Sequence, residues 1–207
     1  MNRNPILRGV VGTVAGLLAS CALAAPAHAG ILTTSATNCD DGVLTQPFQR
    51  WGDGSTYKSV GTFESGTTGW TLSGGAKVVS GNEPWAVHAA GDSHSLSLPS
   101  GSAATTPPVC VGLNEPTLRF FTKRDSGLLS TLAVTVQVQT SLGVWVTLPL
   151  GVDLGGAWHP SAKMLVVANL LPLLPPDRTA VRFTFAPLLA GSWHVDDVYV
   201  DPLHRTA

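Results

Sequence analysis

Two adjacent acidic residues interrupt an apolar stretch near the end of the chain. Asp196 and Asp197 lie inside the run from Trp193 to Val200, which is otherwise mostly apolar. Two carboxylates side by side in such a strand repel each other and need a partner of opposite charge. A bound cation or the guanidinium of Arg182 would supply that charge. The alternative is that one acid faces solvent while the other pairs with Arg182 or caps a turn.

The tryptophans are candidates for a different chemistry, the stacking of sugar rings. Of the 6 in the chain, Trp70 and Trp193 lie in apolar segments and are expected in the core. The other four lie on the polar side of a predicted hairpin or in loops rich in Gly, Pro and Asn. Sugars stack their C–H faces on exposed aromatic planes, although loop aromatics also fold back over cores. The candidate ligand-binding residues are Trp51, Trp85, Trp145 and Trp158.

Two of the 3 cysteines form a natural pair. Cys21 lies in an N-terminal segment predicted to be removed, which leaves Cys39 and Cys110. Such a pair in an exported protein predicts a disulfide, which would close a loop of about 70 residues and stabilise the fold by roughly 4 kcal/mol. A metal site is a weaker alternative, because the sequence contains no C-x-x-C pair. A catalytic thiol is also weaker, because it would have to stay reduced in an oxidising compartment.

Residues 1–29 are typical of a secretory signal peptide. Arg3 and Arg8 precede an apolar run from Val10 to Ala25, and Ala27-His28-Ala29 matches an A-x-A cleavage site. The run is too short for a retained membrane span. We therefore expect secretion, with no membrane span in the mature chain. The alternative is a lipid anchor on Cys21, because the sequence around it is similar to a bacterial lipobox.

The composition excludes several classes of protein. Lys and Arg total 12 and Asp and Glu total 13, so 12% of the residues are charged, about half the usual share. Without a positive excess, the chain is not a nucleic-acid binder of the basic class. Glu, Lys and Arg are too scarce for a coiled coil. No H-x-x-x-H or H-E-x-x-H pattern indicates zinc.

Short alternating segments separated by Gly, Pro, Asn and Ser predict an all-β sandwich. In the clearest one, Thr131 to Gln139, aliphatic residues alternate with Thr, Ala and Gln. A turn and a second alternating run from Val144 to Leu148 complete a predicted hairpin, with Trp145 on its polar side across from Gln137 or Gln139. No amphipathic helix of ten or more residues is visible.

Three short motifs occur in a recognisable order. They are Phe63-Glu64-Ser65-Gly66 before Gly69-Trp70, then residues 181–185 (VRFTF), then residues 195–200 (VDDVYV). This order resembles jelly-roll carbohydrate-binding modules of the galactose-binding-domain-like class, and MAM-type jelly rolls. The whole chain also resembles a group of secreted proteins from high-GC Gram-positive bacteria that have no assigned function.

The resemblance implies an antiparallel jelly-roll β-sandwich over residues 60–202. It follows the signal peptide (1–29) and an irregular segment (30–59) tied by the disulfide, and it precedes a short tail (203–207). In such modules a Glu after the first strand and an Asp of the last strand often hold a structural Ca²⁺. The positions here are Glu64 with Asp196 or Asp197, whose oxygens are the ligands that Ca²⁺ prefers.

A hydrolase is a third hypothesis. Gly91-Asp92-Ser93-His94, Gly112-Leu113-Asn114 and Asp201-Pro202-Leu203-His204 are similar to sequence blocks of SGNH hydrolases, which use a Ser nucleophile and a His base. That family has an α/β fold with a helix after the Ser. Here the residues after Ser93 alternate like a strand, so fold and site disagree.

The sequence therefore predicts a secreted, non-catalytic binding domain rather than an enzyme. Its expected partner is an extracellular or cell-wall glycan, with a structural Ca²⁺ as the expected cofactor. The alternative from another class is a structural or protein-interaction domain at the cell surface, which docks through a low-charge, apolar surface and a sheet edge.

Overall fold

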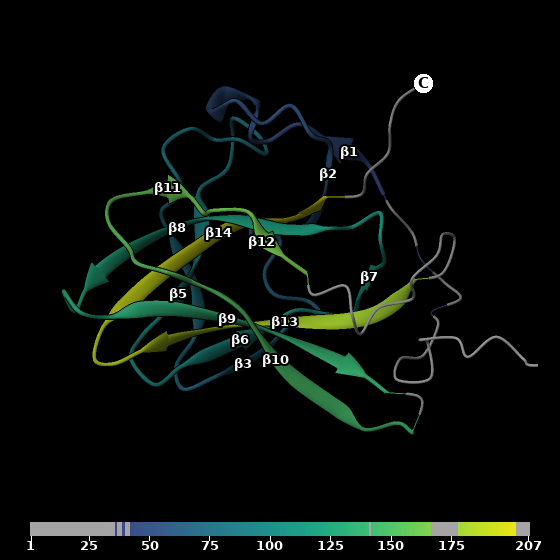
Figure 1. The fold of residues 1–207 in the computed structure, drawn as a ribbon. Helices are drawn as coiled ribbons and strands as arrows, with labels where there is room; N and C mark the ends of the chain where they lie inside the picture. The colour runs from purple at the N-terminus through teal and green to yellow at the C-terminus, as the bar shows by residue number, and fades with distance from the viewer. Residues whose placement is uncertain (1–35, 37–38, 40–41, 141, 167–177, 202–207) are drawn as a thin grey trace, which may run out of the picture.

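A computed structural model of the protein describes residues 36, 39, 42–140, 142–166 and 178–201. Two antiparallel sheets pack face to face, with β9, β10 and β13 in the lower layer of Figure 1 and β8 and β14 in the upper layer. The predicted antiparallel jelly-roll β-sandwich is confirmed. The predicted signal peptide with Cys21, and the tail 203–207, lie outside the described residues. In the part of the chain that is described, no helix is long and apolar enough to cross a bilayer.

Six strands form the first sheet, named sheet A. Its strand order is β10 (Trp145–Asp153), β9 (Thr131–Gln139), β13 (Thr179–Leu188), β6 (Ala103–Thr105) and β3 (Thr71–Ser73), with β7 (Val109–Val111) also paired to β13. The predicted hairpin is confirmed as β9 and β10, and Trp145 lies opposite Gln139. Alternate residues of β9 and β13 are buried, so one face of sheet A covers the core and the other is partly exposed.

Eight strands form the second sheet, named sheet B. Its central strand is β14 (Ser192–Asp201), which pairs on one side with β8 (Thr117–Ser126) and on the other with β5 (His94–Leu98) and then β2 (Tyr57–Gly61). The outer strands of sheet B are β1 (Leu44–Thr45), β4 (Lys77–Ser80), β11 (His159–Pro160) and β12 (Met164–Leu165). The predicted boundary at residue 60 falls inside β2.

Two hydrophobic clusters lie on opposite faces of sheet B. The larger cluster fills the space between the sheets, and Trp193 is fully buried in it, as expected, while Trp70 packs against it. The smaller cluster consists of Phe48, Tyr57, Phe121 and Tyr199 on the outer face. Phe48 immediately precedes the short 3₁₀ helix η2 (Gln49–Trp51), so the segment before β2 packs over sheet B.

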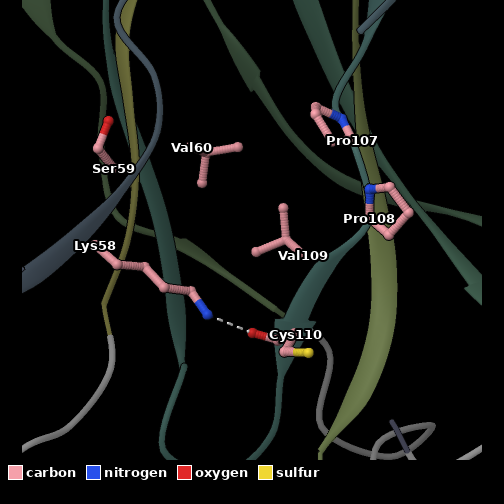
Figure 2. Close-up of a pocket in the computed structure, with 7 residues that line it drawn as sticks. All are labelled: Lys58, Ser59, Val60, Pro107, Pro108, Val109 and Cys110. Carbon is pink, nitrogen blue, oxygen red and sulfur yellow. Dashed lines mark hydrogen bonds between the residues drawn. The ribbon is translucent and has the colours of Figure 1, made fainter. Parts of the chain in front are cut away.

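The predicted disulfide between Cys39 and Cys110 is present, with a Cα–Cα distance of 5.7 Å. It joins the segment before β1 to β7 of sheet A. Beside it lies a hollow of about 310 Å³ lined by Lys58, Pro107, Pro108 and their neighbours (Figure 2). The Lys58 ammonium donates a hydrogen bond of 2.8 Å to the Cys110 carbonyl. This lysine therefore ties β2 of sheet B to β7 of sheet A.

Candidate functional site

The two aspartates of β14 lie where this strand changes its partner. The first half of β14 pairs with β5 as far as Val195, and the second half pairs with β2 from Val198 onward. Asp196 and Asp197 fall between these two segments, at a register shift in the pairing with β8. Asp197 has a φ of 46°, a left-handed conformation that costs energy for a residue with a Cβ. The interruption of the strand pairing therefore changes the direction in which both side chains project from the sheet.

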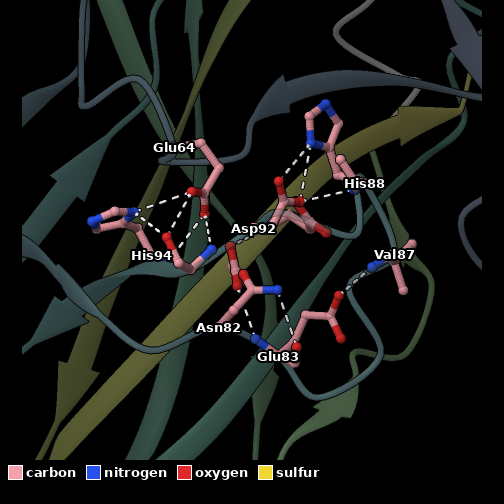
Figure 3. A network of polar contacts seen from close by, with 11 residues as sticks. Glu64, Asn82, Glu83, Val87, His88, Asp92 and His94 are labelled. Carbon is pink, nitrogen blue, oxygen red and sulfur yellow. Dashed lines mark hydrogen bonds and ion pairs between the residues drawn. The ribbon is translucent and has the colours of Figure 1, made fainter.

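Three more carboxylates lie at the ends of the neighbouring strands (Figure 3). Glu64 follows β2, Glu83 follows β4, and Asp92 precedes β5. β2 ends and β5 begins beside the interruption in β14, and the last residue of β4 pairs with the first residue of β5. These strand ends therefore bring the acids to one region. We name this region the acidic cluster: Glu64, Glu83, Asp92, Asp196 and Asp197.

Glu83 organises the loop that follows β4. It is 2% exposed, and its carboxylate accepts hydrogen bonds from the backbone N–H groups of Trp85 and Val87. Its own backbone N–H donates a bond of 3.1 Å to Oδ2 of Asp196. Glu83 thus connects the loop of Trp85 to the last strand of the sandwich.

Glu64 and Asp92 also have hydrogen-bond partners. Oε1 of Glu64 accepts bonds of 2.9 and 2.7 Å from the backbone N–H groups of Ser93 and His94. Asp92 accepts a bond of 2.9 Å from the backbone of Ala89 and lies 3.0 Å from Nδ1 of His88. Glu64 therefore holds the start of β5 against the end of β2, whereas Asp92 stabilises a turn within the segment between β4 and β5.

Asp197 differs from these four acids. It is fully buried, and neither of its carboxylate oxygens has a hydrogen-bond partner. The side-chain oxygen of Asn82 is also buried and unpaired. Burial first, and then the charges of Glu83, Asp92 and Glu64, raise the pKa of Asp197 to about 8. The backbone N–H of His88 lowers this pKa by a smaller amount, although it does not meet the geometry of a hydrogen bond to either oxygen. A buried charge without a partner is costly, so this carboxylate must bind either a proton or a cation.

The backbone around the acidic cluster is strained. Four non-glycine residues of the described chain have positive φ angles, and three of them adjoin the cluster. Phe63 precedes Glu64, Ala86 lies in the loop held by Glu83, and the third is Asp197 itself. Each such conformation costs on the order of 1–3 kcal/mol and persists where surrounding contacts impose it, often at functional sites.

The acidic cluster offers the oxygen ligands that a hard cation prefers. No group of three or more His, Cys, Asp or Glu side chains in the described part of the chain is arranged to hold a metal ion by itself. A cation here would therefore also need the oxygen of Asn82, main-chain carbonyls or water. Arg182 is not the partner of these acids, because it lies on sheet A and contacts Trp145.

The acidic cluster should make the stability of the protein depend on pH in an unusual way when a chelator such as EDTA removes any bound cation. Burial, followed by the charge of Asp197, raises the pKa of Asp196 to about 8. The pKa of Asp197 is raised to about the same value, also mainly by burial. The folded state then binds more protons than the unfolded state between about pH 4 and pH 8, so stability falls as pH rises through this window. We expect a loss on the order of 2 kcal/mol between pH 5 and pH 8, measured by urea unfolding.

The histidines provide a check on this interpretation. The contact with Asp153 raises the pKa of His159, whereas burial lowers the pKa of His194, so their effects on stability oppose each other in this range. The variant Asp197→Asn should remove much of the slope if the cluster causes it. An unchanged slope in this variant would show that other groups cause the pH dependence, such as the histidines or Asp201, whose pKa burial also raises.

The four candidate tryptophans fall on two different sheets. Trp51 and Trp85 contact each other edge to face at 4.9 Å, and both contact Phe121 on the outer side of sheet B. Trp158 packs against the same cluster and contacts His194. Trp145 lies on sheet A, and at 36% exposure it is the most exposed tryptophan. The four rings therefore do not form a single platform.

Trp145 stands at the edge of a surface rich in neutral polar side chains. On the outer face of sheet A, Thr147, Gln137 and Arg182 lie opposite one another on β10, β9 and β13. The next row carries four threonines across β9, β13, β6 and β3, in which the hydroxyls of the middle two are 2.9 Å apart. This row is Thr135, Thr184, Thr105 and Thr71. These side chains are at least partly exposed.

The structure does not support the hydrolase hypothesis. Ser93 immediately precedes a strand, and the fold is all-β rather than α/β. Oγ of Ser93 lies 3.0 Å from Nδ1 of His94, and Oε2 of Glu64 lies 3.1 Å from the same nitrogen. A Ser-His-acid relay requires two different ring nitrogens. The proposed base His204 lies outside the described residues.

No protein-family model and no curated protein matches this sequence, whereas solved structures match its fold. One is the crystal structure of the CBM22-1 and GH10 modules of a Clostridium thermocellum endo-1,4-β-D-xylanase, complexed with xylohexaose. It is 14% identical, with a TM-score of 0.51 over 72% of this chain and 29% of that one. This chain thus spans less than a third of that protein.

Two further structures are single modules that this chain matches over nearly their whole length. The CBM22-1 xylan-binding domain from Paenibacillus barcinonensis Xyn10C is 14% identical, with a TM-score of 0.48 over 72% of this chain and 97% of that one. A CBM61 module in complex with β-1,4-galactotriose is 20% identical, with a TM-score of 0.37 over 68% of this chain and 94% of that one. At these identities, the likeness to the xylanase structure shows the jelly-roll fold alone.

Proposed function

We propose that this protein is a secreted, non-catalytic carbohydrate-binding domain that binds its glycan on the outer face of sheet A. The observation that carries this proposal is the exposed ring of Trp145 beside the rows of Gln and Thr side chains. An aromatic plane stacks on the C–H face of a sugar, while amides and hydroxyls exchange hydrogen bonds with its hydroxyl groups. The surface extends over five strands, which suits a chain of several sugars.

Two further observations support a glycan as the ligand. The fold is one that carbohydrate-binding modules use, and the matched xylanase structure was solved with xylohexaose. The predicted signal peptide and the disulfide are consistent with an extracellular domain. The rings of Trp51, Trp85 and Trp158 have a different role in this proposal, because each packs against the aromatic cluster on sheet B.

We also propose that the acidic cluster holds a structural Ca²⁺. The support is the buried Asp197 carboxylate without a partner, beside the unpaired oxygen of Asn82. The proposed acidic ligands are Glu64, which follows β2, with Asp196 or Asp197 of the last strand. The oxygen of Asn82, main-chain carbonyls or water would complete the coordination. The ion would neutralise the clustered charges and fix the ends of β2, β4 and β5 on β14. It would have no part in chemistry on the glycan.

The glycan proposal is tested by a glycan array followed by titration of the best ligand. Trp145→Ala is expected to weaken binding by about 30-fold, because truncation of a tryptophan that dominates a contact typically costs about 2 kcal/mol. The matched control is Trp158→Ala, which removes a ring from sheet B and is expected to leave the affinity unchanged. Equal affinities of the wild type and Trp145→Ala would refute this surface as the site.

A protein-interaction domain is the second candidate. The edge strand β10 and its flanks expose apolar side chains, of which Val144, Val152 and Leu154 are more than half exposed. An exposed sheet edge with apolar side chains can dock another protein. If no glycan binds on the array, and Val152→Lys abolishes capture of an extracellular protein, this second function replaces the first.

A further inference from the structure

The charged side chains of sheet A are few and unevenly placed. Its six strands contain two charged residues, Asp153 and Arg182. Asp153 lies opposite the buried Leu132, is 7% exposed, and contacts His159. Arg182 lies opposite Gln137, whose side chain is on the outer face. The described strands of sheet A therefore place one formal charge on its outer face, and that charge is positive.

Among the described residues, Arg182 has no acidic partner, whereas several other basic residues do. Arg119 and Lys163 contact Asp53, and Lys123 contacts Asp125. The described contact of the Arg182 guanidinium is with the Trp145 ring, whose centroid lies 4.6 Å away. A cation over an aromatic face is held in place without using its N–H groups as donors to that ring. The N–H groups of Arg182 can therefore still donate to a ligand.

This geometry favours a planar anion as the next contact. A guanidinium presents two parallel N–H groups, which match the two oxygens of a carboxylate. The contact with the Trp145 ring restricts the Arg182 side chain before the anion binds, so less conformational entropy is lost on binding. The neighbouring groups, Gln137, Gln139 and Thr147, are neutral and suit sugar hydroxyls. An acidic sugar meets both requirements at once.

We propose that the outer face of sheet A selects glycans that carry uronic acid carboxylates, and that Arg182 is the residue that recognises the carboxylate. This inference rests on the proposed glycan-binding function and names the class of its ligand. The net charge of the whole chain is −1, so general electrostatic attraction would not draw an acidic polymer to the protein. The selection therefore depends on one residue rather than on overall charge.

The test uses polymers that differ only in their carboxyl groups. Polygalacturonate, glucuronoxylan and alginate are each paired with the same polymer after reduction of its carboxylates to primary alcohols. We expect the purified protein to bind at least one acidic polymer about tenfold or more tightly than its reduced partner, the effect of losing a charge-assisted hydrogen bond. Equal affinity within every pair would overturn the proposal.

Two variants assign the selectivity to its residue. Arg182→Gln should bind the acidic and reduced polymers with equal affinity. The control Lys77→Gln removes an equal charge from an exposed position on β4 of sheet B and should keep the wild-type preference. A preference that survives in Arg182→Gln overturns the assignment. Tighter binding of a sulfated dextran than of any uronate would show that sulfate, rather than carboxylate, is the anion recognised.

The outcome also separates this inference from the function on which it rests. If the protein binds neutral glycans on the array but shows no preference for carboxylates, the uronate proposal fails and the glycan-binding function stands. If it binds neither the arrayed glycans nor any of the six polymers, both fail.

Discussion

In EDTA at pH 8, the variant Asp197→Asn is expected to unfold at a higher temperature than the wild type. The wild-type carboxylate is fully buried and has no hydrogen-bond partner, so removing its charge relieves repulsion from the other acids. The expected gain is roughly 2 kcal/mol, or about 4 to 8 °C in Tm for a domain of this size. An acidic residue that destabilises its own fold in this way is explained by a bound cation.

Ca²⁺ is expected to reverse this order. The wild type should gain about 4 kcal/mol when Ca²⁺ is present at a thousand times its Kd, because the ion binds the folded state alone. Asp197→Asn should gain little, since it lacks a charged ligand. The measurement is thermal unfolding followed by circular dichroism, in EDTA and across a Ca²⁺ titration.

The control for this experiment is Asp125→Asn, which removes a carboxylate that is 37% exposed and paired with Lys123. It should respond to Ca²⁺ as the wild type does. If the wild-type Tm is the same in EDTA and in saturating Ca²⁺, the cation proposal is wrong. The raised pKa of Asp197 would then mean that the buried carboxyl is simply protonated.

The second large effect is expected at the ion pair of Asp53 and Arg119. Nη1 of Arg119 lies 2.7 Å from Oδ2 of Asp53, and both side chains are buried. Arg119→Met should destabilise the protein by about 3 to 5 kcal/mol, measured by urea unfolding at pH 7, because Asp53 loses its main buried counter-charge. Lys163, whose ammonium is 3.1 Å from Asp53 and half exposed, would offset only part of this loss.

This pair matters because it fastens the N-terminal segment to sheet B. The Arg119 guanidinium lies 4.0 Å from the centre of the Phe48 ring and donates to the Ser161 carbonyl. Asp53 also accepts a bond of 2.7 Å from Tyr57. Burial alone would raise the pKa of Asp53, but its hydrogen bonds from Tyr57, Ser55 and Lys163 outweigh burial and hold the pKa well below its usual range.

A double-mutant cycle separates the pair from its surroundings. Asp53→Asn with Arg119→Met should cost less than the sum of the single changes, since neither charge is then left alone. The control, Lys123→Met, removes a partly exposed ion pair with Asp125 and should cost less than about 1 kcal/mol. Strictly additive costs for Asp53 and Arg119 would contradict a direct interaction.

The fold was largely predictable from local sequence patterns. The alternation in Thr131 to Gln139 produced a strand with every second residue buried, because a strand with one face on the core requires this period. The pairing of Trp145 with Gln139 followed from the short turn between the two strands. Cys39 and Cys110 formed a disulfide, as expected for the two cysteines that follow the predicted signal peptide.

The candidate site was less predictable, because long-range pairing assembles it. Asp196 and Asp197 were recognisable as acids in an apolar strand, and Glu64 followed from a family resemblance. Glu83 and Asp92 were missed as cluster residues, since they lie in turns where acids are ordinary. Their common feature is a position within three residues of a strand end, but only the exchange of partners along β14 shows that these ends meet.

The tryptophans show the same limit. Position in a loop did not distinguish Trp51 and Trp85, which pack on Phe121, from a ring available to a ligand. The segment before β2 covers the outer face of sheet B, and no local pattern in Gly42 to Ser55 predicts that packing. Trp145 was placed more reliably, because strand alternation fixes which face a side chain takes.

The most direct test of the account is to map where a glycan contacts the protein. The best ligand from the array is titrated into ¹⁵N-labelled protein in saturating Ca²⁺, and backbone amide shifts are followed by NMR. The account predicts that the largest shifts lie on β9, β10 and β13, around Gln137, Trp145 and Arg182. Largest shifts around Trp51, Trp85 and Trp158 on sheet B would contradict it.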